Sequence, residues 1–383
     1  MQSLAPSKRL LTIHHIEFYV SNALQKISIK KNHCNIYFNI IKASYWYCMN
    51  FGFRRFAIKE NEQWRSIAIR NGNIVFIFTT CKEYDEDFVK HIATHGDSIK
   101  NIAFVVDDIN ATVEQIVGAG GFLEKPVEII SDEYGSIKVT MIDSPECDVS
   151  HSLLDPKTYN GFFLPKFESF GDSSELLETL YDYCKDFQKK LCFITIFNLK
   201  CSENLMPNFR QEISITSIDH FVMGFPMNSS HSASAFYHRI FDLQEIWSAD
   251  GSIFNSNSSA MKISLLANNT KTIQIGLVEP IPKTLRVRSQ IQEFLDYNSG
   301  AGVQHVAFLV EDITETAERM KYRGVKFVDI PYEYYEDLQE RLANSSVKIT
   351  ESFEKGFGDG NVKALYSAVE KSQEKRGTLI KEL

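Results

Sequence analysis

The sequence predicts an α+β protein made of four related units that are arranged as two similar halves. Residues 101–112 (NIAFVVDDINAT) and 305–316 (HVAFLVEDITET) share an apolar strand, an acidic turn and the start of a helix, and they lie 204 residues apart. A second pair, residues 13–16 (IHHI) and 218–221 (IDHF), lies 205 residues apart. A repeat of this kind indicates duplicated supersecondary units, each expected to run as strand, helix and further strands.

Length and composition narrow the class of protein. The chain has 383 residues, enough for two cores of roughly 150–200 residues each. It is 44% hydrophobic and 23% charged, without an apolar run near the ~20 residues that a membrane span needs. A net charge of −8 argues against nucleic-acid binding, and seven scattered cysteines without CxxC spacing argue against a disulfide framework. The expected partner is a small molecule or another protein.

In the first half, hydrophobic patterning and turn residues predict a strand and a helix, a hairpin, and then a second unit of the same kind. The strand is at residues 12–20, and the helix is at 43–51, closed by Gly52. The hairpin joins strands at 64–70 and 73–79 through Asn71-Gly72, and the second unit spans 100–154, with a helix closed by Gly120. Residues 26–41 and 185–206 are rich in Lys, Ile, Asn and Phe and have no clear amphipathic period. Both segments are interpreted as insertions.

The second half repeats the order of the first. Its predicted elements are a strand at 218–223, a helix at 232–240, strands at 251–257, 262–267 and 273–276, a strand that opens on His305, a helix at 314–323 closed by Gly324, a short strand at 325–328 and a helix at 332–342.

Histidines distinguish the two halves. His220 and His305 stand at equivalent strand starts in the second half, where the first half has His15 and Asn101. Two imidazoles on first strands of paired units can converge on one metal ion. The first half lacks this pair. His151 also lies in a predicted strand, and its alternation with apolar neighbours favours a structural role.

Four motifs resemble the 4-hydroxyphenylpyruvate dioxygenases and 4-hydroxymandelate synthases. They are IDHF around His220, residues 289–308 (SQIQEFLDYNSGAGVQHVAF), residues 331–342 (PYEYYEDLQERL) and residues 356–377 (GFGDGNVKALYSAVEKSQEKRG). The resemblance implies the vicinal oxygen chelate fold, shared with glyoxalases, bleomycin resistance proteins and extradiol dioxygenases, with four βαβββ units of which the last is truncated.

The same resemblance implies a domain organisation. Residues 12–165 would form an N-terminal domain without metal, residues 166–216 a linker, and residues 217–383 a C-terminal iron-binding domain that ends in a lid helix at 362–371. Two copies are expected to pair through the metal-free half. Neither a nucleic acid nor a membrane is expected as a partner.

In the family, iron(II) is held by two histidines and a glutamate, and the histidines correspond here to His220 and His305. A site of this kind leaves positions for an α-keto acid and for O₂. The third ligand is out of register, because only about thirteen residues (343–355) replace the two or three strands of ~5 residues that complete a unit. Glu351 and Glu354 are the nearby carboxylates.

Three further positions correspond to residues that contact the aromatic keto acid in the family. They are Gln290, Gln304 and Phe357, the last of which would stack on the substrate ring. The pocket departs from the homogentisate-forming enzymes, because Ile263 and Val278 stand where those enzymes place serine and asparagine. This departure favours 4-hydroxymandelate as product. The resemblance also implies a mitochondrial enzyme that feeds the ubiquinone headgroup, with the cytoplasm as the other compartment.

The missing glutamate leaves alternatives open. The first is a non-catalytic protein that binds the aromatic keto acid without iron, and the second is a ring-cleaving enzyme or glyoxalase-like isomerase on the same fold. The ending at residues 356–377 argues against the second. The two insertions and the deletion are also what a translated intron and a skipped exon would produce, in which case the gene encodes a competent dioxygenase.

Overall fold

The computed structural model describes residues 10–21, 38–144, 146–169, 212–249, 261–281 and 289–327. Several predictions therefore lie outside the described residues: the insertion at 185–206, most of the one at 26–41, the strand at 251–257, the helices at 332–342 and 362–371, and Glu351, Glu354 and Phe357. Within the described ranges no helix has the length and apolar character to cross a membrane.

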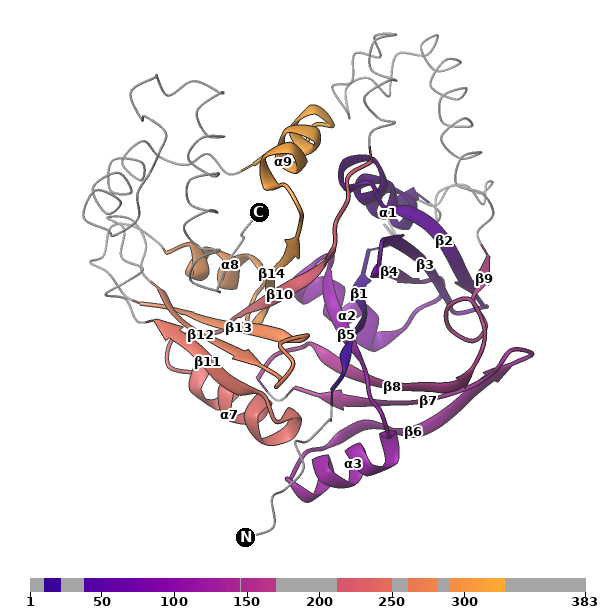
Figure 1. Ribbon diagram of the computed structural model, residues 1–383, viewed down its shortest axis with the longest axis horizontal. Coiled ribbons are helices and arrows are strands. Elements are labelled where there is room, and N and C mark those ends of the chain that lie inside the picture. The colour runs from indigo at the N-terminus through magenta and orange to yellow at the C-terminus, as the bar shows by residue number, and fades with distance from the viewer. Residues whose placement is uncertain are drawn as a thin grey trace.

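One mixed sheet holds both units of the first half. Its strand order is β6-β7-β8-β5-β1-β4-β3-β2-β9. The strands are β1 (Thr12–Tyr19), β2 (Arg54–Glu60), β3 (Trp64–Asn71), β4 (Ile74–Cys81), β5 (Ser98–Val105), β6 (Leu123–Asp132), β7 (Gly135–Asp143), β8 (Ser150–Tyr159) and β9 (Glu168–Ser169). The two units meet where β1 pairs with β5, in the middle of the sheet (Figure 1).

The second half contributes a five-stranded sheet of order β11-β12-β13-β10-β14. Its strands are β10 (Ser217–Gly224), β11 (Gln244–Ala249), β12 (Met261–Ala267), β13 (Gln274–Pro280) and β14 (Gly302–Leu309). The helices of the two halves are α1 (Phe38–Phe51), α2 (Glu86–His95), α3 (Ile109–Gly118), α7 (Ser230–Phe241), α8 (Gln290–Tyr297) and α9 (Ile313–Tyr322).

The central strands of the two halves pair in the same way. β1 runs parallel to β4 and antiparallel to β5, and β10 runs parallel to β13 and antiparallel to β14. Even the irregularities agree, because the register shifts at Ile13/His15 in β1 and at Ile218/His220 in β10. The strands aligned by the internal repeat thus occupy equivalent places.

A single apolar core joins the two halves. Phe308 of β14 packs its ring against Phe76 of β4 and Phe51 of α1, with ring centroids 6.1 and 6.3 Å away. α3 of the first half also contacts α7 of the second half, and both helices lie on the lower side of Figure 1. α8 packs on β13 and on β10, the strand that carries His220.

The structure corrects three of the predicted elements and adds elements that were not predicted. α1 begins at Phe38, within the segment taken as an insertion, and α2 was not predicted at all. β14 begins at Gly302, so His305 is not the first residue of its strand. Residues 325–327 form no strand. The closing glycines are confirmed, since Gly120 and Gly324 have the positive φ angles that end a helix (+79° and +93°).

Candidate metal centre

The antiparallel pair of β10 and β14 brings His220 and His305 together. His220 lies opposite Ala307, and Val222 lies opposite His305, so the two histidines are diagonal neighbours on one face of the sheet. Their ring centroids are 5.8 Å apart and the rings are nearly perpendicular, at 75°. The register of this pair shifts next to His220 and after Val222, and such bulges often re-aim side chains at functional sites.

Each imidazole is held by a neighbouring acceptor at Nδ1. Asp219 Oδ2 lies 2.7 Å from His220 Nδ1, and Gln304 Oε1 contacts His305 Nδ1. Carboxylate and amide oxygens accept hydrogen bonds, so each Nδ1 carries the hydrogen and each Nε2 keeps its lone pair. An oriented imidazole with a free Nε2 is the form that ligates a metal ion.

His305 Nε2 is buried and has no hydrogen-bond partner among the described residues. Burial, and then the nearby His220, lowers the pKa of His305 to about 4, so the ring is neutral at physiological pH. A buried nitrogen without a partner costs free energy unless something binds it. These two histidines therefore fit two ligand positions of a transition-metal ion.

The third ligand is not within the part of the chain that the structure describes. No described carboxylate completes a group of three with His220 and His305. The buried carboxylate of this sheet, Glu279, accepts hydrogen bonds from the backbone N–H of Ser230 at 3.1 Å and from Lys262 Nζ at 3.3 Å. The Glu279 carboxylate is therefore already engaged by these two donors.

An apolar cluster shares this face with the histidine pair. Val222, Val278, Ile291 and Leu295 form its buried part, and Met261, Ile263 and Phe294 pack against it. Ile263 lies directly opposite Val278 in the pair of β12 and β13. The two positions singled out as apolar replacements are thus cross-strand partners beneath α8.

The two glutamines lie at different depths. Gln304 is partly buried and contacts His305, whereas Gln290 is exposed in the first turn of α8, just after the N-cap Ser289.

His151 is fully buried, and its Nε2 lies 2.8 Å from the Tyr237 hydroxyl, which agrees with the structural role predicted for it.

The equivalent place in the first half is occupied by other hydrogen bonds. Asn101 accepts from the backbone N–H of Ser152 and donates to its hydroxyl, both at 2.9 Å. His15 is paired with His14, their Nδ1 atoms being 2.8 Å apart. Asn101 stands where the second half has His305, and this half has a polar hydrogen-bond network at that place.

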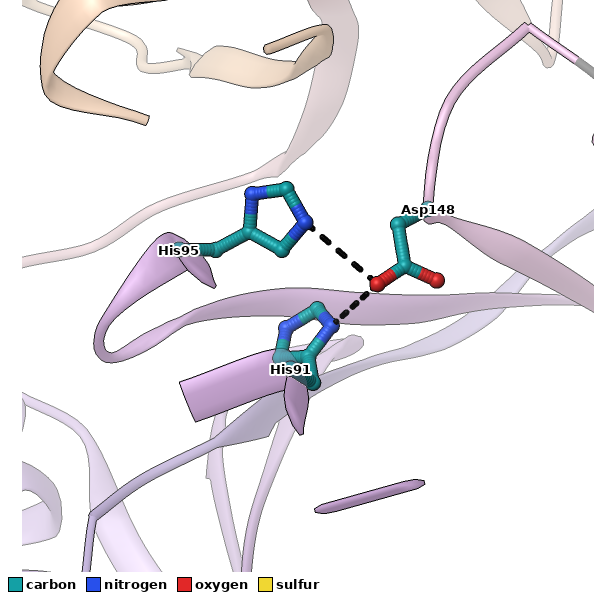
Figure 2. Close-up of side chains that lie close together, drawn as sticks. All are labelled: His91, His95 and Asp148. Carbon is teal, nitrogen blue, oxygen red and sulfur yellow. Dashed lines mark hydrogen bonds and ion pairs between the residues drawn. The ribbon is translucent and has the colours of Figure 1, made fainter. Parts of the chain in front are cut away.

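Sequence reasoning missed another polar group of the first half, formed by His91, His95 and Asp148 (Figure 2). The two histidines are four residues apart, which places them on one face of a helix. That spacing, after the N-cap residue Asp85, was the available signal. Asp148 is distant in sequence and could not have been added without the fold.

Comparison with known proteins gives three findings. Residues 220–340 match the Glyoxalase/Bleomycin resistance protein/Dioxygenase superfamily. The chain is 30% identical to the 4-hydroxyphenylpyruvate dioxygenase of Caenorhabditis elegans, over 95% of this chain and 92% of the relative, and 32% identical to another protein of that organism whose name states no activity, over 96% and 98%. A substituted 4-hydroxymandelate synthase from Streptomyces coelicolor shares the fold, with a TM-score of 0.63 at 21% identity over 95% of this chain and 99% of that one. The expected fold is confirmed.

Proposed function

The chain belongs to the 4-hydroxyphenylpyruvate dioxygenase family, and from that membership we propose that it is an iron(II)-dependent dioxygenase of 4-hydroxyphenylpyruvate. The observation that carries the proposal is the pair of His220 and His305, whose rings meet on one face and whose buried Nε2, on His305, has no partner among the described residues. The conversion takes the keto acid and O₂ to a hydroxy acid with loss of CO₂. No separate keto-acid co-substrate is needed.

The residues around the pair have distinct parts in this proposal. His220 and His305 would hold the iron(II), which supplies positions for the keto acid and for O₂. Asp219 and Gln304 keep both rings oriented through their Nδ1 atoms. The apolar cluster around Val222 would receive the aromatic ring and exclude water from the reacting carbon.

The product proposed is 4-hydroxymandelate, with homogentisate as the second possibility. Ile263 and Val278 face each other on the site side of the sheet, and neither offers a hydrogen bond to the phenol or to the side chain of the substrate. A site that lacks such partners discriminates differently from one that has them. A mitochondrial location and a homodimer paired through the first half complete the proposal.

A second function is favoured by the missing carboxylate. No described carboxylate joins His220 and His305, so a protein that binds the aromatic keto acid without iron would use the same cluster. In that function Glu351 and Glu354 would have no part in the site, whereas in the dioxygenase one of them would bind the metal.

Iron loading of the purified full chain under anaerobic conditions separates the two functions. The dioxygenase should hold about one iron per chain that depends on His305, and His305→Ala should lower the affinity for this iron at least ~100-fold, since even outer partners of a ligand cost 10–100-fold. His231→Ala removes an exposed imidazole and is the matched control. NMR of the reaction mixture then assigns the product.

Each outcome is informative. If the iron that His305→Ala removes is far below one per chain, and keto-acid binding is unchanged in that variant, the dioxygenase is rejected in favour of the binding protein. Loss of iron in Glu351→Gln or in Glu354→Gln, but not in both, would identify the third ligand.

A further inference from the structure

The first half contains a second group of metal-ligand type, far along the chain from His220 and His305. His91 and His95 lie one turn apart on α2, and Asp148 lies in the turn before β8. Asp148 Oδ2 is 3.0 Å from His91 Nδ1 and 3.3 Å from His95 Nε2, and the three ligand atoms lie within 4.8 Å of one another. Figure 2 shows both rings directed at the same carboxylate oxygen. We propose that this group binds a divalent transition-metal ion of the zinc class.

Outer hydrogen bonds orient both rings toward Asp148. The carbonyl oxygen of Asn298 lies 2.6 Å from His95 Nδ1, so this nitrogen carries the hydrogen and Nε2 keeps a lone pair. His91 Nδ1 is hydrogen-bonded to Asp148 Oδ2 at 3.0 Å, and its Nε2 lies 2.9 Å from the Ser98 hydroxyl. A metal ion would replace the hydrogen between His91 and Asp148, with the Ser98 hydroxyl as the acceptor for Nε2–H.

Three ligand atoms thus converge on one point. A proton or a metal cation among them keeps the ring nitrogens and the carboxylate oxygen from repelling one another. Ligand atoms around one tetrahedral ion at ~2.1 Å lie roughly 3.4 Å apart, so small side-chain rotations would complete the shell.

The donor set and its surroundings indicate the class of ion. Two imidazoles and one carboxylate suit zinc and its neighbours in the transition series, whereas magnesium and calcium prefer oxygen ligands. The Asp148 side chain is 48% exposed, which opens the site to solvent and leaves room for a water at the fourth position. Lys100 Nζ lies 2.6 Å from Asp148 Oδ1, the oxygen that faces away from the rings.

The site would connect three segments. α2 and the turn before β8 supply the ligands, and the His95 hydrogen bond reaches Asn298 at the end of α8. The Asn298 amide in turn donates to the carbonyls of Gly300 and Ala301, just before the strand that carries His305. An ion here would therefore brace the approach to β14 from the first half. The inference does not depend on the proposed function.

Cobalt(II) binding to the full chain, followed by visible absorption and metal analysis, tests this site. In a background with His220→Ala and His305→Ala, about one cobalt should still bind with the strong visible bands of tetrahedral coordination. Asp148→Asn and His95→Gln should each weaken binding at least ~10-fold, with His231→Ala as control. In the unaltered chain the same two variants should remove one bound ion and leave the other.

A gain-of-affinity variant guards against loss of fold. Lys100→Gln removes the cation that competes for Asp148, so cobalt affinity should rise by up to about fivefold, an effect that unfolding cannot imitate. Far-UV circular dichroism checks each variant. Absence of bound cobalt in molar excess of metal would overturn the proposal. So would unchanged affinity in both Asp148→Asn and Lys100→Gln.

Discussion

At the scale of single residues, His151 holds an uncharged ring at the seam between the halves. It is fully buried on β8, and its Nε2 lies 2.8 Å from the hydroxyl of Tyr237 on α7. Burial lowers the pKa of His151 to about 4, while the unfolded chain keeps a value near 6.5. Between these values the unfolded chain takes up the proton first. The free energy of unfolding is therefore expected to fall as the pH drops from 6.5 to 4.

The expected loss from His151 alone is at most about 3.5 kcal/mol over the whole interval and about 2 kcal/mol between pH 7 and pH 5, because each pKa unit corresponds to about 1.4 kcal/mol. Urea unfolding at pH 7 and pH 5 measures it. His151→Gln should show a smaller loss over this interval than the unaltered chain. Part of the loss should remain, because burial also lowers the pKa values of His14 and His15. His231→Gln, an exposed control, should keep the full loss. Equal losses in all three proteins would contradict the argument.

The residues of the candidate centre were predictable to different degrees. His220 and His305 followed from the repeat, because equivalent strands of a duplicated unit must meet and both histidines lie on them. Their orienting partners, Asp219 and Gln304, are sequence neighbours, but which ring nitrogen they contact depends on side-chain rotamers. Asp148 could not be joined to His91 without the fold, since 57 residues separate them.

At the scale of elements, the β6–β7 hairpin depends on Gly135. Its φ of +125° is one that other residues rarely adopt, and a Cβ there would lie 2.2 Å from the carbonyl oxygen of Thr158 on β8. Gly135→Ala is expected to lower the free energy of unfolding by more than about 2 kcal/mol, because both the backbone and the β7–β8 pair must shift. Urea unfolding followed by circular dichroism measures the change.

A glycine in a helix supplies the matched control. Gly118 ends α3, and a Cβ there meets nothing within 4 Å. Gly118→Ala should therefore be neutral or stabilise the protein by up to about 1 kcal/mol, since it lowers the entropy of the unfolded chain. If the two alanine variants lost equal stability, the explanation for Gly135 would have to be abandoned.

Elements were predictable where a pattern was repeated and local. The strand at 12–20, the hairpin around Gly72 and the helix that ends before Gly324 are confirmed, because alternation, turn residues and cap glycines mark them. α2 was missed although α8 lies at the equivalent place 204 residues further on, because the apolar residues of α2 are few. α1 starts earlier than expected, since an unusual composition at 26–41 was interpreted as foreign sequence.

At the scale of the whole molecule, duplication was predictable and docking was not. The offset of the repeat implied two similar halves. The contacts between them depend on which apolar side chains remain uncovered after each sheet has formed, and that is a property of the three-dimensional surface. Phe308 illustrates the point: the repeated motif placed it in an apolar strand, but its ring partners Phe51 and Phe76 belong to the other half.

The shared core implies that the two halves unfold together, and Phe308→Ala tests this. Phe308 is 5% exposed and fills the space between β14 and α1, so its truncation should cost about 3–5 kcal/mol. Its neighbour Leu309 is 36% exposed, and Leu309→Ala should change the free energy of unfolding by less than about 1 kcal/mol. Tryptophan fluorescence, with Trp46 and Trp64 in the first half and Trp247 in the second, should give the same midpoint as circular dichroism. In Phe308→Ala both midpoints should move together, because the lost contacts belong to both halves. Two separate transitions, with only the second half destabilised, would mean that the halves fold independently and that the seam contributes little.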